Sequence, residues 1–398
     1  MQAKHKTLGL FAAALGMVAI AAIVPEKPNT PAPNPPNPHP IHVTDVKPVT
    51  DAERPLVQVA LLLDTSSSMD GLIDQARSEL WRIVGQLSEG KRNGKAPRLQ
   101  LALYEYGNDG LPAGEGYIRQ VVGLTGEIDR VSEALFALRT NGGQEYAGLA
   151  IRNALVALPW SEDEDALKLI FVAGNEGFNQ GPVASAEAIA LAKKQGVTVN
   201  PIFCGAEQAG IAQGWQTAAM LAGGFYLTID HNQAVAQIAA PQDAELAKLN
   251  TAINGTYIPY GVEGAAGFQR QAAQDANSSG YGLANLATRG SFKASANYRN
   301  DSWELVDALD QGRVKLDDLE ETGLPAAMKG MTKGERAAYV AAKKAERDAM
   351  KKRIRDLTKE REAFVAAERK KLGQEDSLDV AMLGAVKKLA GAKGLSFE

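Results

Sequence analysis

One carboxylate and two hydroxyls stand at alternate positions, Asp64, Ser66 and Ser68, directly after the apolar run 57–63. In an extended chain, residues two apart point the same way, so these three side chains can aim their oxygens at one point while the residues between them face elsewhere. Hard divalent cations such as Mg2+, Ca2+ or Mn2+ prefer oxygen ligands. The spacing therefore predicts a divalent-cation site. The alternative is a helix cap, for which a single side-chain acceptor is sufficient.

The elements that must position this site alternate along 55–240 between short β-rich runs and stretches of helical period. Strands are expected at 57–63, 99–106, 117–123, 167–173, 197–203 and 225–229. Helices are expected at 72–87, 128–138, 146–158, 183–194 and 215–221. This alternation is typical of an α/β fold with a doubly wound, mostly parallel sheet, and the closely spaced second and third strands suggest an antiparallel edge. Ligands of such sheets bind beyond the carboxyl ends of the strands, which is where Asp64 lies.

The pattern of Asp64, Ser66 and Ser68 after an apolar strand resembles the metal-ion-dependent adhesion site (MIDAS) of von Willebrand factor type A (VWA) domains. The resemblance covers 55–240 and implies a Rossmann-like sheet that acts as a binding module and not as an enzyme. It also implies a bound Mg2+, or else Ca2+ or Mn2+, that engages a protein partner through a carboxylate of that partner.

Two further loops depart from the family's pattern. Members usually carry a Thr after paired Gly residues, but this chain has Gln144 and Glu145 there, and it has Asn175 and Glu176 where Thr-Asp-Gly is usual. Glu145 and Glu176 are therefore candidate metal ligands. The remaining candidates, as additional ligands or rim residues, are Gln144, Asn175, Glu105 and Asp109. An added carboxylate would hold the cation more firmly but weaken its attraction for a partner's carboxylate. The alternative is that both glutamates only cap the helices that follow them, because a negative charge is favourable at a helix N-terminus.

The N-terminus is typical of an exported protein. Residues 1–6 are basic and 7–24 are apolar or small, so 1–24 is expected to be a signal peptide or an uncleaved anchor that gives membrane association. A Pro/Asn-rich linker follows at 25–54. The periplasm or cell envelope is the expected location. The net charge of −4 gives no reason to expect a nucleic-acid partner, and the single Cys204 excludes an intramolecular disulfide and is expected to be a packed thiol.

Two regions are expected after the sheet, a loop-rich and helical transition region at 241–330 and a charged helical region at 331–398. The first begins with a helix at 243–254, continues as a loop-rich stretch over 255–290, and ends with a helix that starts at Asp301 or Ser302, beside Trp303 as a packing anchor. The second opens with the capping box of Thr332 and Glu335 and continues as one long helix to 372. A shorter helix at 378–389 is expected to fold back on it as a hairpin.

The long helix carries a narrow apolar seam suited to a partner helix or a coiled coil. Its members are Met350, Ile354, Leu357 and Phe364. Arg347 and Arg361 interrupt the seam, which argues against a long, strict coiled coil.

The leading hypothesis is a cell-envelope module that binds a protein through the cation. One alternative is a metal-independent envelope scaffold assembled through the C-terminal helices. Another is a serine hydrolase with Ser66 or Ser68 as nucleophile. That reaction needs a base, but of the four histidines only His231 lies in the folded part, and nothing near it suggests a Ser-His pair.

Overall fold

The computed structural model describes residues 54–232, 237–372 and 378–397. The expected signal peptide or anchor and nearly all of the expected linker lie outside the described residues. The described residues belong to a single compact unit. None of their helices is long and apolar enough to cross a membrane.

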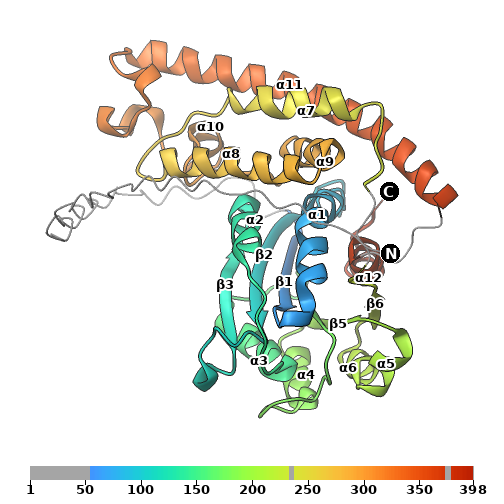
Figure 1. Ribbon diagram of the computed structural model, residues 1–398. Coiled ribbons are helices and arrows are strands. Elements are labelled where there is room, and N and C mark those ends of the chain that lie inside the picture. The colour runs from blue at the N-terminus through green and yellow to red at the C-terminus, as the bar shows by residue number, and fades with distance from the viewer. Residues whose placement is uncertain (1–53, 233–236, 373–377, 398) are drawn as a thin grey trace, which may run out of the picture. The chain divides into compact units, whose positions relative to one another are not determined.

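A six-stranded sheet forms the centre of the fold, with the strand order β3-β2-β1-β4-β5-β6 (Figure 1). Its strands are β1 (Leu56–Asp64), β2 (Arg98–Tyr106), β3 (Ile118–Thr125), β4 (Leu167–Gly174), β5 (Thr198–Cys204) and β6 (Leu227–Ile229). All neighbouring pairs are parallel except β2 and β3, which are antiparallel. The prediction of a doubly wound, mostly parallel sheet with one antiparallel edge is therefore confirmed. Cys204 is buried and free, as expected.

Helices cover both faces of the sheet because the central strands are apolar on both sides. Alternate residues of β1 enter two different hydrophobic clusters, with Val59 and Leu61 in one and Ala60 and Leu62 in the other. The first face is covered by α1 (Asp70–Leu87), α2 (Ile128–Ala137) and α12 (Leu378–Gly391). The second is covered by α3 (Ala147–Ala157), α4 (Ser185–Lys194) and α6 (Trp215–Ala222), beside the short helix α5 (Glu207–Ala212), which the sequence analysis missed.

The last helix, α12, returns to the sheet from the far end of the chain. Leu378 and Met382 are buried in the same cluster as Leu61 of β1, and Asp379 forms an ion pair with Arg82 of α1. The expected hairpin is therefore wrong, because α12 packs mainly against the sheet and α1 and not against the preceding long helix. An ion pair of Arg369 with Asp379 at 3.5 Å joins the two helices. Burial of apolar side chains against the sheet outweighs such a contact.

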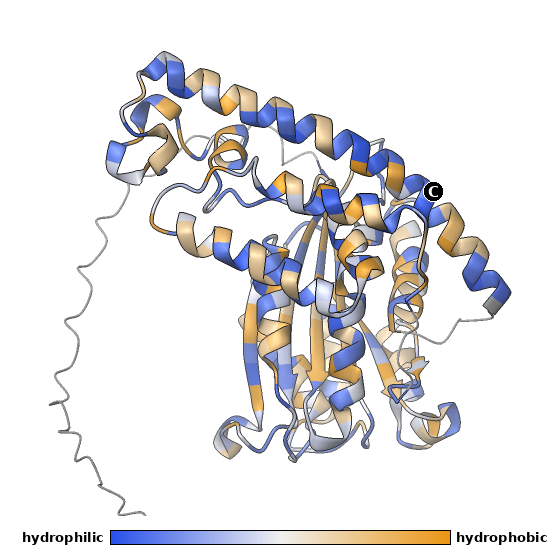
Figure 2. Cartoon of the chain, turned by 45° about the horizontal axis from the view of Figure 1, so that its top comes forward, coloured by the Kyte–Doolittle hydropathy of each residue, from blue (hydrophilic) through white to orange (hydrophobic). Residues whose placement is uncertain are grey.

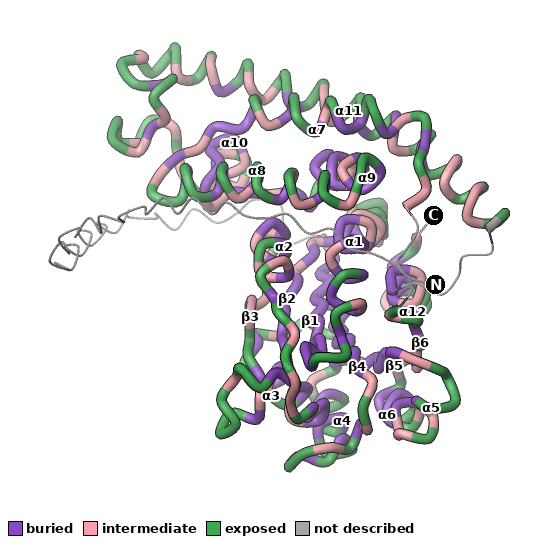
Figure 3. Tube along the Cα trace, viewed as in Figure 1, coloured by how far each residue is buried: buried purple, intermediate pink, exposed green. Residues whose placement is uncertain are grey.

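Between β6 and α12 the chain builds a layer of helices (Figures 1 and 3). They are α7 (Asp243–Asn254), α8 (Gly264–Gly280), α9 (Leu283–Lys293), α10 (Leu305–Asp310) and α11 (Lys333–Leu372). Short 3-10 helices occur at Ser67–Met69, Ala113–Glu115, Leu316–Asp318, Glu321–Gly323 and Ala326–Met328. The loop-rich stretch expected at 255–290 is wrong, because α8 and most of α9 lie there.

The glycines that suggested a loop serve close packing instead. A Cβ at Gly267 of α8 would lie 2.2 Å from the ring of Trp303, and one at Gly290 of α9 would lie 3.0 Å from Asn250. Trp303 is the packing anchor that the sequence suggested, with 2 % of its surface exposed. The helix after it begins later than expected, since the side chain of Glu304 accepts the Asp307 amide and caps it.

The long helix α11 is largely hydrophilic, in contrast to the strands (Figure 2), and opens with the expected capping box of Thr332 and Glu335. Its seam is covered by the same chain, because Ile354 and Leu357 are buried and α11 packs on α7 and α9. The two arginines that interrupt the seam pair with acidic residues of the helical layer.

A buried ion pair joins the helical layer to the sheet. Arg289 of α9 is fully buried and donates to Asp129 of α2 at 2.7 Å. Tyr298 donates to the other oxygen of the same carboxylate at 2.7 Å. Because buried charges are costly unless they are paired, this contact fixes how the two layers meet.

Candidate metal centre

The end of β1 brings the Asp64, Ser66 and Ser68 side chains together. Asp64 is fully buried, and its Oδ1 accepts the amide of Ser66 at 2.7 Å. The hydroxyls of Ser66 and Ser68 lie 3.3 Å apart. The residue between them and the strand, Thr65, turns the other way and donates to Glu105 at 3.2 Å. Three oxygen-bearing side chains thus gather at the carboxyl edge of the sheet.

The second loop lies directly on this cluster. The amide of Asn141 donates to the carbonyl of Thr65 at 2.9 Å. This loop brings Glu145 close to Asp64, and both side chains lie next to Gly107. A Cβ added at Gly107 would lie 2.8 Å from Oδ1 of Asp64 and 2.9 Å from Cγ of Glu145. Gly107 has φ +80°, and its missing side chain leaves the room in which the two carboxyl groups meet.

The third loop closes the cluster from the side of β4. Asn175 donates through Nδ2 to the hydroxyl of Ser68 at 3.0 Å. Glu176 is exposed, but it lies near enough for its charge to raise the pKa of both Asp64 and Glu145. Its carbonyl accepts the indole N–H of Trp215 at 2.7 Å, which fixes the loop on α6.

The electrostatics of the cluster favour a bound positive charge. Burial raises the pKa of Asp64 to about 6. Burial, followed by the charge of Asp64, raises the pKa of Glu145 to about 9. Oδ2 of Asp64 and Oε2 of Glu145 are buried without a hydrogen-bond partner. Unpartnered carboxyl oxygens inside a protein are unfavourable unless a proton or a cation neutralises them.

The donor set fits a hard divalent cation. It offers carboxylate oxygens of Asp64 and Glu145 and hydroxyls of Ser66 and Ser68, the oxygen ligands that Mg2+ and Ca2+ take. In the described part of the chain, no three His, Cys, Asp or Glu side chains gather in a geometry typical of a metal ion. A cation here would therefore depend on the serine hydroxyls as well as on the acids.

The fold and this arrangement agree with a comparison against protein families. The model of the von Willebrand factor type A domain matches residues 58–240. These residues form a VWA domain. No curated protein matches the chain.

Solved structures similar to this chain are distant. They include PTMP1 of the mussel byssus with a zinc-occupied MIDAS motif, at 16% identity and a TM-score of 0.34 over 44% of this chain and 42% of that one. BatB of Bacteroides thetaiotaomicron has 18% identity and a TM-score of 0.34 over 44% and 90%. The SpRpn10 VWA domain has 17% identity and a TM-score of 0.32 over 44% and 88%. The chain thus spans about two fifths of the mussel protein.

The predicted rim of the VWA domain needs one correction. Glu105 is buried and bonds to Thr65 and Arg119, so it lies beneath the first loop and not on a binding rim. The reason is strand alternation: Tyr104 and Tyr106 face the α3 side, so Glu105 faces the opposite side. Asp109 is exposed in the loop that follows β2. Its backbone amide donates to the carbonyl of Gly142 in the second loop at 2.6 Å.

Gln144 lies on the wall of a hollow next to Asp64, Ser66 and Ser68. It lines this hollow, of about 540 Å³, together with Gly143, Glu145, Tyr146, Glu176, Gln180 and Gly181. A Cβ at Gly181 would lie 2.5 Å from the ring of Tyr146, so the wall of this hollow is closely packed.

Sequence reasoning missed two contacts that hold the VWA loops. Tyr106 donates through its hydroxyl to the carbonyl of Ala173 at 2.9 Å, beneath Asp64. Thr140 donates to Asp70 at the start of α1. The sequence offered only a weak indication of the contact between Thr140 and Asp70, namely that Thr140 stands two residues before the paired glycines of the second loop. The contact of Tyr106 depends on which face of β2 each tyrosine takes.

Proposed function

We propose that the VWA domain binds a protein partner through a divalent cation held by Asp64, Ser66 and Ser68, with Glu145 as a further ligand, and that it does so in the cell envelope. The observation that carries the proposal is Oδ2 of Asp64, which is buried beside two serine hydroxyls without a hydrogen-bond partner. A bound Mg2+ would supply an electrophilic centre that accepts an oxygen of the partner. The envelope location rests on the basic and apolar start of the sequence.

The nature of the partner follows from the charge of the site. Glu145 and Glu176 place two acids beside Asp64, and no lysine or arginine lines the adjacent hollow. A cation in this setting keeps less net positive charge than one held by a single carboxylate. We therefore propose that a partner's carboxylate binds weakly unless a basic group of the same partner contacts Glu176.

The alternatives have less support. The scaffold hypothesis was favoured by the altered second and third loops and assigns assembly to the C-terminal helices, but Ile354 and Leu357 of the α11 seam are buried within the chain. The hydrolase hypothesis needed a base on Ser66 or Ser68. Among the described residues neither hydroxyl bonds to a histidine: they lie next to each other, and Ser68 also bonds to Asn175.

Calorimetric titration of the full chain with Mg2+, Ca2+ and Mn2+ tests the cation. We expect saturable binding that Asp64→Ala abolishes, whereas Ser67→Ala retains it, because Ser67 is exposed between the two ligand serines and does not bond to either. Equal binding by wild type and Asp64→Ala would remove the cation from the proposal.

Capture of partners from envelope extracts tests whether the domain binds a protein through the cation. The wild-type chain and Asp64→Ala are each used with and without a chelator. A partner retained only by the wild type, and only without chelator, supports cation-dependent binding. A partner that both chains capture in the presence of chelator would favour the metal-independent scaffold.

A further inference from the structure

A second hollow lies at the amino ends of the strands, opposite the candidate metal centre at their carboxyl ends. It has a volume of about 660 Å³ and is formed where β4 begins, where α3 ends and where α4 leads into β5. Four lysines line it, namely Lys168, Lys193, Lys194 and Lys393. They come from a strand, from a helix end and from the C-terminal segment, so three separate parts of the chain bring positive charge to one place.

Lys168 is the unusual member of this group. It stands on β4, a central parallel strand whose other residues are apolar or glycine, and only 7% of its surface is exposed. Its ammonium group donates to the carbonyls of Ser161 at 2.8 Å and Gln195 at 2.7 Å. Among the described residues it forms no ion pair with a carboxylate. The two carbonyls take two of the three donors of the ammonium group, so its charge is hydrogen-bonded but not neutralised by a carboxylate.

The other lysines add to the positive charge of the hollow. Lys193 and Lys194 are exposed in the last turn of α4, and Lys393 donates to the carbonyl of Glu164. Burial lowers the pKa of Lys168, and the charge of Lys393 lowers it further. Asp163 and Glu164 act in the opposite direction but to a lesser degree. Because two glutamates line the hollow against four lysines, an excess of positive charge remains.

The walls supply an apolar surface beside these charges. Leu155, Leu158, Pro159 and Trp160 line the hollow. Trp160 is half-buried, and its indole N–H donates to the carbonyl of Ala154 at 3.1 Å, so the ring is held in one orientation. A small ligand could thus place an anionic group on the lysines and an apolar or ring body against this wall.

We propose that this hollow binds a phosphate group carried on a small apolar or aromatic body. Lysine ammonium groups bind phosphate as point charges, and a dianion matches the charge that the four lysines leave uncompensated. The ring of Trp160 and its apolar neighbours favour an organic phosphate over the bare ion. The site is independent of the proposed cation centre, because the two lie at opposite ends of the strands.

Fluorescence and calorimetry on the full chain test this site with inorganic phosphate and phenyl phosphate, at constant ionic strength set with chloride. Trp160 is the reporter, since Trp81, Trp215 and Trp303 are at most 2 % exposed. We expect saturable binding with phenyl phosphate tighter than inorganic phosphate. Trp160→Phe should remove the fluorescence change but leave a calorimetric signal.

Variants separate a built site from general attraction. Lys193→Ala/Lys194→Ala should weaken phenyl phosphate binding about tenfold or more, because charge-assisted contacts are lost. The control Lys352→Ala/Lys370→Ala removes the same charge from exposed positions of α11 and should bind like the wild type. Asp64→Ala should also bind normally, which distinguishes this site from the cation centre. Absence of binding beyond chloride, or an equal loss in the α11 control, would overturn the proposal.

Vesicles with and without phosphatidylglycerol identify the source of the phosphate. Sedimentation with the anionic vesicles, competed by phenyl phosphate and lost in the Lys193/Lys194 variant, supports a lipid headgroup. Binding of phenyl phosphate without sedimentation supports a free organic phosphate.

Discussion

The carboxyl groups of Asp64 and Glu145 meet in the space that Gly107 leaves free. A Cβ at Gly107 would lie within 2.9 Å of atoms of both side chains, and each carboxyl keeps one buried oxygen without a hydrogen-bond partner. Asp64 is the last residue of β1 and Glu145 lies in the second loop, so their approach joins the strand end to that loop. A proton or a cation is needed to neutralise the pair. Glu145 thereby brings a carboxylate to a place where the family's pattern has a neutral Thr nearby.

Glu145→Gln should change cation and partner binding in opposite directions. Loss of one anionic ligand should weaken Mg2+ binding about tenfold, or about 1.4 kcal/mol. The cation should then attract a partner's carboxylate more strongly, because less of its charge is neutralised. Calorimetric titration measures the first effect and acetate competition the second. Gln144→Ala is the control, since Gln144 lines the neighbouring hollow. If Glu145→Gln binds Mg2+ as tightly as the wild type does, Glu145 is not a ligand.

Gly107→Ala should disturb the site through crowding, in addition to backbone strain. The matched control is Gly94→Ala, because Gly94 has φ +75° and no atom within 4 Å of an added Cβ. Gly94→Ala should lower the free energy of unfolding only by the strain of a left-handed alanine backbone, about 1–2 kcal/mol. Gly107→Ala should cost about 1–3 kcal/mol more, since the new methyl group meets Asp64 and Glu145. Urea unfolding measures both, and calorimetry should find Mg2+ binding lost only in Gly107→Ala. Equal destabilisation would mean that the two carboxyl groups move aside freely.

The sheet could be predicted from the sequence because its strands are short apolar runs between helices of clear period. Asp64 could be placed at a strand end by the same argument. The approach of Glu145 could not, because it depends on the path of two loops and on one glycine between them. The helices α8 and α9 were missed because Gly267 and Gly290 look like loop residues in sequence, although both pack closely in space. The return of α12 to the sheet is a long-range contact that local periodicity does not encode.

Arg347 anchors α11 on the other segments of the helical layer through a buried ion pair. Its guanidinium donates to both oxygens of Glu304, at 3.0 and 2.7 Å, and to the carbonyl of Thr256 at 2.7 Å. Arg347→Met should cost about 3–5 kcal/mol, because Glu304 would remain buried without its partner. The control Arg353→Met removes an exposed pair with Glu245 on the same helix and should change stability little. Chemical unfolding measures both, and similar losses would show that the buried pair is not the anchor.

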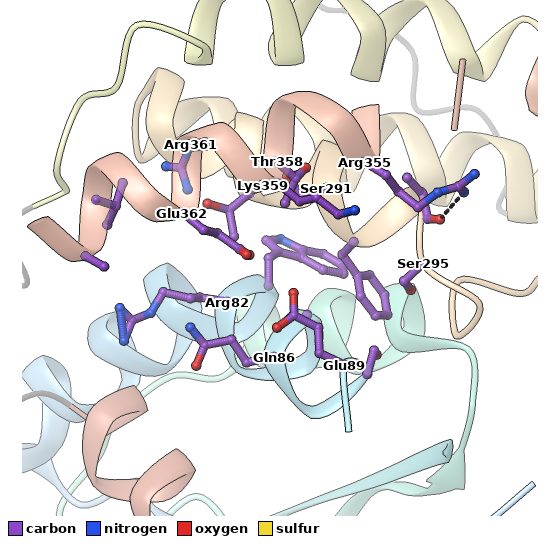
Figure 4. A pocket seen from close by; sticks show the side chains of 18 of the residues that line it. Arg82, Gln86, Glu89, Ser291, Ser295, Arg355, Thr358, Lys359, Arg361 and Glu362 are labelled. Atoms are coloured by element: carbon purple, nitrogen blue, oxygen red, sulfur yellow. Dashed lines mark hydrogen bonds between the residues drawn. The ribbon is translucent and has the colours of Figure 1, made fainter. Parts of the chain in front are cut away.

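Glu89, in the turn after α1, and Glu362 of α11 should make stability depend on pH. They face each other across a hollow of about 650 Å³ (Figure 4). Burial, followed by the charge of Glu89, raises the pKa of Glu362 from 4.5 to about 7. Between these two values the folded chain keeps a proton that the unfolded chain has lost. The stabilising contribution is therefore complete below pH 4.5 and is lost as the pH rises through about 7.

Glu362→Gln should remove this dependence, because a neutral amide does not titrate. The variant should match the wild type near pH 5 and exceed it at pH 8, by less than about 1 kcal/mol, because both side chains keep part of their surface in solvent, which screens their charges. Urea midpoints measured across this range check the difference. Glu360→Gln is the control and should keep the wild-type pH profile, because Glu360 is an exposed acid of the same helix and is not among the groups that shift the pKa of Glu89. A Glu362→Gln profile parallel to that of the wild type would mean that the two carboxyl groups do not interact across the hollow.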